Sequence, residues 1–343
     1  MPFISSRDPL WQQILENTPH DVYHLPGFAA IEAGLLNGEA IAWYHQEQGN
    51  TFLIPLVSRT INGGQEFRDL VSPYGYSGML TLKNIDADEA SHALSLFNKE
   101  AAANGYVSSF LRLNPLLNSW QLPQTEAWRQ WFHGGTVSVM LETDIEVLRR
   151  SYSENHRRNL NALNKLQYTT RVNQWQHLPD FMEAYRQTMN RRNAHPYYYF
   201  PETYFQMLRN LLGENLMLIS VYDAEGKWTA GGLFTRFGDV MQYHLGATRD
   251  EYLSHSPSKL MLDRAIVEGK QTGSRILHLG GGLGGSTTDG LFRFKKGFAL
   301  KYHPYTSLRF IHLPSVYEKL RAALGKGYNR NTYFPEYRVV IEE

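Results

Sequence analysis

LHLGGGLGGSTTDGLFRFKKGF, residues 277–298, is the stretch that decides how the fold of this 343-residue chain is read. An apolar run that predicts a strand leads into five glycines within six positions, 280–285. Glycine has no Cβ and lets the backbone approach a ligand closely, whereas a flexible turn is the alternative explanation. Five glycines are more than a turn needs, and we therefore predict a functional loop.

The same loop contains a pattern that is typical of dinucleotide-binding proteins. Gly280, Gly282 and Gly285 satisfy G-x-G-x-x-G after a predicted strand. That motif also needs a helix that starts within the loop and an acidic residue about 20 positions further on, which holds the ribose. We expect neither here, because the loop continues into an aromatic and basic segment. The pattern therefore does not predict a dinucleotide site.

The segment after the loop, residues 292–298, interleaves aromatic and basic side chains. From Asp289 to Arg309 there are five Lys or Arg residues and one acid. Such a mixture suits a nucleic acid end or a phosphate-bearing substrate, through stacking and charge. The alternative is an alternating strand with phenylalanines inward and cations outward, and both interpretations can hold together.

Composition excludes several classes of site. The chain has no cysteine, which excludes disulfides, thiolate metal sites and cysteine nucleophiles. The 13 histidines are scattered and form no HExxH pattern, so we expect no metal site and no tightly bound cofactor. The N-terminal sequence lacks the features of a signal peptide, and no window is apolar enough for a membrane span. These observations predict a soluble cytoplasmic protein; its oligomeric state is not predicted.

Charge is distributed unevenly along the chain. Residues 1–148 contain 7 Lys or Arg and 16 Asp or Glu, whereas residues 149–343 contain 27 and 17. The asymmetry indicates two units, the second better suited to a polyanionic partner. The alternative is that two unrelated solvated surfaces differ in sign.

Turn signals and the spacing of apolar residues predict the elements of each half. The first half has a helix at 8–17, strands at 40–45 and 51–58, a helix at 88–104, and strands at 107–113 and 136–141. The second has helices at 145–166, 178–192 and 201–212, strands at 216–223, 229–237 and 240–245, a helix at 258–272 and a strand at 275–279. This order predicts an α/β (α+β) fold with a mixed, helix-flanked sheet in each half.

Further candidate residues lie outside the glycine loop. The predicted helix at 145–166 carries a basic run in which Arg157 or Arg158 could reach a cleft, oriented by Glu154 on the same face as Arg150. A solvated charged face is the alternative. Proton carriers are conceivable in two further places, although a histidine on a strand is often structural. These are Tyr243-His244 on a predicted strand, and Asp69, which precedes the rigid aromatic loop SPYGYSG at 72–78.

At these residues the chain resembles the FemAB family of peptidyltransferases and the related FemAB-like GNAT proteins. The resemblance covers about residues 8–300, in family order, and its last motif is the most specific. The matching stretches are DVYHLPGF (21–28), DLVSPYGYSG (69–78), YSENHRRNLNAL (152–163), TMNRRNA (188–194) with the following YF (199–200), MQYHLGAT (241–248), SPSKLMLDRAI (256–266) and LHLGGGLGG…DGLFRFKKGF (277–298).

The resemblance implies two tandem GNAT-like units with a cleft between them. We place the first domain at residues 1–147 and the second, with the donor-binding loop, at 148–309. In some members the final strands return to the first unit, which implies that residues 310–343 complete the first domain. The long coiled-coil arm of some members is missing here. The basic residues that hold the nucleotide-sugar end of the precursor in those members have no clear counterpart in the acidic first half.

The resemblance also implies a reaction, in which an aminoacyl group passes from aminoacyl-tRNA to an amine of a peptidoglycan or related cell-envelope precursor. The family's Phe-Lys pair for the tRNA acceptor end falls on Phe294 and Lys295. We expect Lys295, helped by Arg293, to be catalytic. The expected donor-binding residues are Phe294, Lys296, Gly280, Gly281 and Gly282. The expected acceptor-binding residues are Tyr74, Tyr76, Arg157, Arg158, Tyr243 and His244.

Two alternatives remain open. One is an acyl-CoA-dependent GNAT N-acyltransferase of cell-envelope or exopolysaccharide biosynthesis, although the Q/RxxGxG/A loop of such enzymes has no good match, since the sequence around Arg249–Tyr252 lacks the glycines. The other is a scaffold that binds tRNA or glycan without catalysis.

Overall fold

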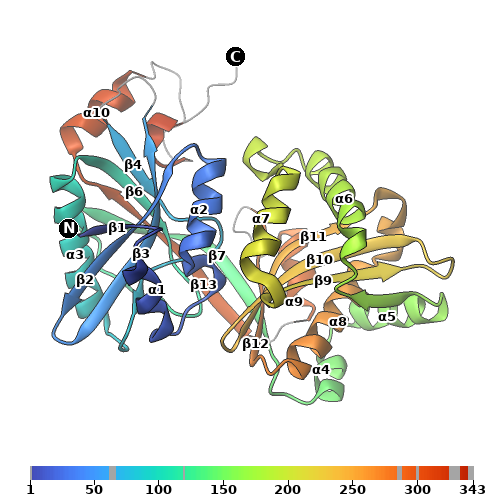
Figure 1. The fold of residues 1–343 in the computed structure, drawn as a ribbon. Helices are drawn as coiled ribbons and strands as arrows, with labels where there is room; N and C mark the ends of the chain where they lie inside the picture. Colours follow the sequence, from blue (N-terminus) through green and yellow to red (C-terminus); the bar gives the residue numbers. More distant parts are fainter. Residues whose placement is uncertain are drawn as a thin grey trace. The chain divides into compact units, whose positions relative to one another are not determined.

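The structure, a computed structural model, describes residues 2–61, 67–118, 120–283, 288–298, 301–323 and 333–338. It consists of two compact units, one formed by residues 1–133 and 304–343, the other by residues 134–303 (Figure 1). The sequence placed these boundaries at 147/148 and 309/310. In the structure they fall within strands β7 (Trp128–Met140) and β13 (Lys301–Ile311), so no linker composition marks them.

Unit 1 contains a mixed sheet with the strand order β1-β2-β3-β4-β6-β13, and β5 pairs with β3. Strands β4 and β6 pair in parallel, whereas the pairs β1–β2, β2–β3, β3–β4 and β6–β13 are antiparallel. The strands other than β13 are β1 (Phe3–Ser5), β2 (Glu39–Glu47), β3 (Asn50–Thr60), β4 (Arg68–Val71), β5 (Leu80–Thr81) and β6 (Tyr106–Arg112).

Helices cover both faces of this sheet. On one face, Phe97 of α3 packs with Trp43 and Phe310, at ring-centre distances of 5.6 and 5.3 Å. On the other face, Ala33 of α2 packs against Val57 and Val71. The helices of unit 1 are α1 (Pro9–Glu16), α2 (Pro26–Leu35), α3 (Ala87–Ala103) and α10 (Pro314–Ala322), with 3₁₀ turns η1 (Val22–His24) and η6 (Glu336–Arg338).

In the sheet of unit 2 the strands follow the order β7-β12-β11-β10-β9-β8. Strands β11 and β12 are parallel, and the other printed pairings are antiparallel. The strands other than β7 are β8 (Thr169–Val172), β9 (Leu216–Tyr222), β10 (Trp228–Phe237), β11 (Val240–Thr248) and β12 (Ile276–Gly281).

Helices flank this sheet as well. Met261, Leu262 and other apolar residues of α8 pack on the sheet's core side chains, and α6 contacts β10 and β11. The helices are α4 (Ile145–Ser151), α5 (Glu154–Lys165), α6 (Leu178–Arg191), α7 (Glu202–Leu212), α8 (Ser258–Gln271) and α9 (Gly290–Lys296). The 3₁₀ turns are η2 (Trp175–His177), η3 (Pro196–Tyr198), η4 (Gly213–Asn215) and η5 (Asp250–His255).

The predicted fold class, mixed sheets flanked by helices in each half, is confirmed. The helix expected at 8–17 is α1, with Asp8 as its N-cap and Pro9 in its first turn. None of the helices within the described ranges is long and apolar enough to cross a membrane.

The prediction of a single helix over 145–166 is wrong, because two helices, α4 and α5, occupy this range. Tyr152 and Ser153 adopt extended backbone angles, and Ser153 caps α5 by accepting a hydrogen bond from the N–H of His156 (3.3 Å). Serine favours such caps because its hydroxyl satisfies an N–H that lacks a partner within the helix. Arg150 therefore lies in the last turn of α4 rather than sharing a face of one helix with Glu154.

A buried carboxylate ties this broken helix to α8. Asp263 of α8 accepts hydrogen bonds from Arg149 Nε (3.1 Å), Arg149 Nη2 (2.8 Å) and the hydroxyl of Tyr152 (3.0 Å). Its side chain is only 11% exposed. If one member of such a buried charged cluster is removed, the remaining charge and hydrogen-bond donors lose their partner.

Asp263→Ala is expected to lower the free energy of unfolding by about 2–4 kcal/mol, because Arg149 and Tyr152 lose their shared acceptor. Urea unfolding of the variant and the wild type measures the change. The matched control is Asp239→Ala, which removes an exposed ion pair with Arg275 and should have a much smaller effect on stability. Equal losses in the two variants would contradict the role given to Asp263.

Candidate active site at the parting of two strands

The parallel strands β11 and β12 pair over only three positions, the last of which joins Gln242 to His278. Beyond this point β11 remains paired with β10 as far as Thr248, and β12 remains paired with β7 as far as Gly281. The two strands therefore part in the middle of the sheet. Both have a register irregularity there, at His244 and at Leu279. Bulges of this kind redirect side chains and are common beside functional sites.

Helix α9 follows the glycine loop, so the expectation that no helix follows is wrong, as is the alternative of an alternating strand. Asp289 forms its N-cap and accepts hydrogen bonds from the N–H groups of Phe292 (2.8 Å) and Leu283 (2.9 Å). A Cβ at Gly282 would lie 1.9 Å from Asp289 Oδ2, so this position requires glycine. Residues 284–287, which include Gly285 of the G-x-G-x-x-G pattern, lie outside the described residues.

The helix directs Lys295 into the protein. Its side chain is only 9% exposed. Its Nζ donates a hydrogen bond to the carbonyl oxygen of Gly281 (2.6 Å), at the end of β12, and lies 5.6 Å from the ring centre of Tyr243 on β11. Lys295 thus contacts one residue from each of the strands that part.

Burial lowers the pKa of Lys295 to about 7. The carboxylate of Asp289 opposes this shift, and the positive charge of Arg192 adds to it. A lysine with a pKa near neutrality is populated in both protonation states and can donate or accept a proton at little cost.

The N-terminal end of α5 holds α9 in place. The N–H of Ser153 donates to the carbonyl of Gly297 (2.9 Å), and Nε2 of His156 donates to the carbonyl of Phe294 (2.8 Å). Burial lowers the pKa of His156, which favours the neutral ring. A Cβ at Gly297 would lie 2.4 Å from His156 Nε2, so the close contact depends on glycine. The motifs YSENH and FRFKKGF are therefore neighbours in space.

The expected donor-side residues fall together in unit 2. Gly281 and Gly282 contact Lys295 and Asp289 as described, and Gly280 has a φ of +72°, which favours glycine. Arg293 and Lys296 are exposed on α9. Phe294 is half-buried, with its ring centre 5.6 Å from that of His156.

The expected acceptor-side residues are divided between the two units. In unit 1, the N–H of Tyr74 donates to Glu32 (3.2 Å), and the ring of Tyr76 packs against those of Tyr23 and Tyr305. In unit 2, Tyr243 lies beside Lys295, and burial raises the pKa of its hydroxyl.

His244, the next residue on β11, lies instead against α7. Its Nε2 is 2.8 Å from the hydroxyl of Tyr204, and burial lowers its pKa to about 4. It is therefore a neutral, buried residue, in line with the structural alternative.

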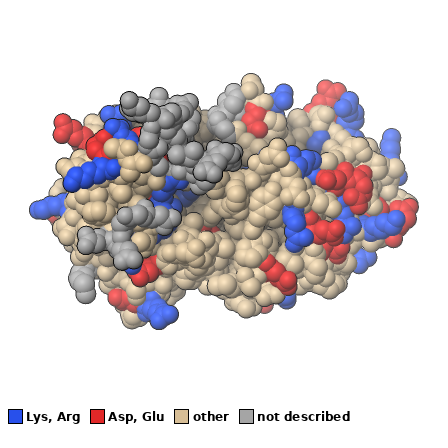
Figure 2. Space-filling model, turned by 90° about the horizontal axis from the view of Figure 1, so that it is seen from above, with Lys and Arg blue, Asp and Glu red and all other residues tan. Residues whose placement is uncertain are grey.

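Arg157 and Arg158 are exposed on α5, and Arg157 donates to the carbonyl of Arg150 (3.4 Å). The described ion pairs include none between Glu154 and either arginine, so the expected orientation by Glu154 is not seen. Their exposure agrees with a solvated face. Figure 2 shows basic side chains mixed with acidic ones toward the right of the view.

Two residues near Lys295 were missed in the sequence. Arg192, just after α6, lies close enough for its charge to lower the pKa values of Lys295 and Asp289. Burial raises the pKa of Asp289, but backbone N–H donors and Arg192 together lower it. His278 on β12 is completely buried, with Nδ1 3.0 Å from Ser138 Oγ, and burial, His303 and Lys295 hold its pKa well below the usual range. Arg192 lies in the TMNRRNA motif, which was the available signal. Among the described residues, no group of three or more His, Asp or Glu side chains is placed to hold a metal ion.

Comparison with known proteins agrees with this fold. Residues 149–296 match the model of a family described as an acetyltransferase (GNAT) domain. The structure of FemX superposes with a TM-score of 0.70 over 93% of this chain and 99% of that one, at 14% sequence identity.

The chain has the FemAB-like GNAT fold.

Other structures share this fold. L-PGS from Bacillus licheniformis superposes with a TM-score of 0.55 over 91% of this chain and 95% of that one, at 14% identity. A conserved protein of unknown function from Bacteroides thetaiotaomicron superposes with a TM-score of 0.56 over 90% and 99%, at 10% identity. No curated protein matches the sequence. At these identities the likeness to solved structures concerns the fold.

The depressed pKa of Lys295 predicts a pH-dependent stability difference. The unfolded chain holds the proton up to about pH 10.5, whereas the folded chain releases it above about pH 7. The unfolded state therefore binds more protons in this window, and the penalty for burying the ammonium, complete below pH 7, disappears as the pH rises. Lys295→Met has no such penalty.

The free energy of unfolding of Lys295→Met should exceed that of the wild type by the largest amount at about pH 6. This difference should fall by up to about 1.4 kcal/mol per pH unit above pH 7. Urea unfolding of both proteins from about pH 6 to about pH 9.5 measures this. A difference that stays constant over the range would contradict a buried, neutralised Lys295.

Proposed function

We propose that the protein is an acyltransferase that moves an aminoacyl group from aminoacyl-tRNA to an amine of a peptidoglycan or related cell-envelope precursor. The observation that carries this proposal is Lys295, whose Nζ lies between the parted strands β11 and β12 at the carbonyl of Gly281. The GNAT domain match over residues 149–296 and the fold shared with FemX and L-PGS support acyl transfer.

The reaction needs positioning and charge stabilisation more than activation, because an aminoacyl ester is already reactive. The acceptor nitrogen attacks the ester carbonyl, a C–N bond forms and the C–O bond to the ribose breaks. In this proposal the ammonium of Lys295 stabilises the oxyanion of the tetrahedral intermediate. The proton lost by the attacking amine ends on the leaving hydroxyl, and a lysine with a pKa of about 7 is suited to carry it.

The surface of α9 supports a nucleic acid donor. Arg293 and Lys296 are exposed on the same short helix as Lys295, and exposed cations suit the phosphates of an acceptor stem. Phe294 is half-buried against His156, so only part of its ring is accessible for stacking on the terminal adenine.

Acyl-CoA is the second candidate donor. The observation in its favour is that the matching family model is described as an acetyltransferase (GNAT) domain. Against it, the chain lacks a good Q/RxxGxG/A loop, as noted above.

Lys295→Met is expected to reduce transfer by at least about tenfold, because the charge that stabilises the oxyanion is lost. The assay follows movement of a labelled aminoacyl group from a charged tRNA minihelix to a peptidoglycan precursor. Lys227→Met, in the exposed turn between β9 and β10, is the matched control and should retain wild-type activity. Full activity of Lys295→Met would contradict the catalytic role proposed for Lys295.

The donor can be identified by thermal shift with each candidate. The proposal predicts stabilisation by the charged minihelix and by the precursor. A shift with acetyl-CoA and none with the minihelix would favour the second donor. Binding without turnover of any donor would favour a scaffold that binds tRNA or glycan.

A further inference from the structure

Lys295 is held at both ends of its side chain. At one end, Nζ donates to the carbonyl of Gly281 (2.6 Å). At the other end, the peptide that joins Phe294 to Lys295 carries the carbonyl that accepts a hydrogen bond from His156 Nε2 (2.8 Å). The first contact sets where the charge lies, and the second holds the backbone from which the side chain starts.

The carbonyl of Phe294 belongs to the last turn of α9, a helix of seven residues. The last four carbonyls of a helix lack N–H partners in the regular helical pattern. Within the helix this carbonyl accepts from the N–H of Gly297 (3.2 Å), whereas the N–H of Phe298 donates to Lys295 instead (3.1 Å). The shorter bond to the carbonyl therefore comes from His156, a residue of another helix.

Packing holds the ring of His156 in one orientation. The residue is only 5% exposed, and its ring centre lies 4.4 Å from that of Phe298 and 5.6 Å from that of Phe294. Phe298 in turn packs on Tyr152, at a ring-centre distance of 4.9 Å, and the hydroxyl of Tyr152 donates to Asp263. The imidazole is thus anchored to α8 as well as to α9.

The ring is neutral and carries its proton on Nε2. Burial lowers the pKa of His156, the bond to Phe294 opposes this shift, and the charge of Lys259 adds to it. A carbonyl oxygen can only accept, so the ring nitrogen that faces it carries the proton. Nδ1 is then an acceptor, and it is buried without a hydrogen-bond partner in the part of the chain that the structure describes.

A role in stability alone explains this arrangement poorly. A buried polar atom without a partner costs free energy, and a phenylalanine would fill similar space without that cost. What histidine adds to an aromatic ring is one donor, and this donor meets the peptide that precedes Lys295. The arrangement therefore favours a role in placing the lysine.

Gly297 makes room for the contact. A Cβ at this position would lie 2.4 Å from His156 Nε2. The backbone angles of Gly297, φ −62° and ψ −16°, are ones that alanine adopts without strain. Glycine is therefore required here by the space that the imidazole takes and not by the backbone conformation.

We propose that His156 is a positioning residue for the transfer reaction, which holds the peptide between Phe294 and Lys295 so that Nζ stays at the carbonyl of Gly281. A displacement of about 1 Å at a reacting group can cost about 10²-fold in rate, so the loss of this one bond is expected to lower kcat. The effect on catalysis rests on the proposed function, whereas the effect on the position of Lys295 does not.

The test compares His156→Phe, which keeps an aromatic ring but has no donor, with the wild type in two measurements. In the transfer assay, kcat should fall by at least about tenfold while KM for both substrates stays within about threefold. In NMR of ¹³C-labelled lysines, the pKa of Lys295 should rise by at least about one unit, because a lysine that leaves its fixed position is better solvated. A role confined to stability would change neither quantity.

Three further variants make the test specific. His156→Gln places an amide N–H close to the position of Nε2 and should restore kcat to within about threefold of the wild type. Gly297→Ala should behave like His156→Phe, because its Cβ displaces the imidazole. In a His156→Ala background, where the ring is absent, Gly297→Ala should have little further effect.

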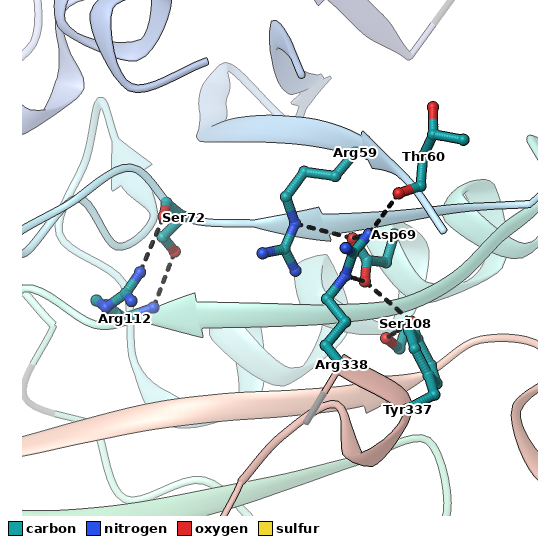
Figure 3. A network of polar contacts seen from close by, with 8 residues as sticks. All are labelled: Arg59, Thr60, Asp69, Ser72, Ser108, Arg112, Tyr337 and Arg338. Carbon is teal, nitrogen blue, oxygen red and sulfur yellow. Dashed lines mark hydrogen bonds and ion pairs between the residues drawn. The ribbon is translucent and has the colours of Figure 1, made fainter. Parts of the chain in front are cut away.

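The matched control is Tyr337→Phe in unit 1, which also keeps an aromatic ring and removes a buried hydrogen-bonding group (Figure 3). The hydroxyl of Tyr337 donates to Asp69 (3.1 Å) and lies 2.7 Å from Ser108 Oγ. Asp69 is completely buried and also accepts from Arg59 (3.0 Å) and Arg338 (2.9 Å). Tyr337→Phe should lower stability, while kcat and the titration of Lys295 stay at their wild-type values.

Three results would overturn the inference. They are a wild-type kcat in His156→Phe, a loss of kcat without a shift in the titration of Lys295, and an equal loss of kcat in Tyr337→Phe. If His156→Phe does not fold, the effect of Gly297→Ala with and without His156→Ala makes the same comparison. If the wild type transfers no aminoacyl group, the proposed function fails, and the titration of Lys295 in His156→Phe still tests the positioning.

Discussion

The parting of β11 and β12 after Gln242 and His278 is the constraint on which the candidate active site depends. Each strand keeps its partner on the outer side, so the sheet stays intact while its centre opens. The Nζ of Lys295 donates a hydrogen bond to the carbonyl of Gly281 at the end of β12. Burial of a cation is tolerated here because it satisfies this acceptor, and the same burial lowers the lysine pKa toward neutrality. One feature of the sheet thus accounts for both the position and the protonation of Lys295.

Motifs that are far apart in the sequence serve to hold this lysine. The carbonyls of Gly297 and Phe294, at the end of α9, accept hydrogen bonds from Ser153 and His156 at the start of α5. In turn, Asn155 and Asn159 of α5 accept hydrogen bonds from Lys259 of α8 (2.5 and 3.0 Å). Most residues of YSENHRRN and SPSKLMLDRA that make described contacts are therefore structural. Their positions explain why the motifs occur together without each one contributing to the chemistry.

Much of the fold could be predicted from the sequence, because caps and apolar spacing are local signals. The start of α1 at Asp8 and Pro9 and the meander of β9, β10 and β11 are examples. The break at Ser153 was missed because helical spacing of apolar residues continues across it. Helix α9 was missed because seven residues of alternating aromatic and basic type resemble a strand. The role of Arg192 depends on where α6 ends relative to β11, so it has no local signal in the sequence.

The central claim is that Lys295 is a buried lysine poised near neutral pH at the parted strands. Its titration can be followed by NMR in protein whose lysines are labelled with ¹³C at Cε. The account predicts one lysine signal that titrates near pH 7 and that is absent from Lys295→Met. A wild-type spectrum in which no lysine titrates below about pH 9.5, or in which the low-pH signal persists in Lys295→Met, would contradict it.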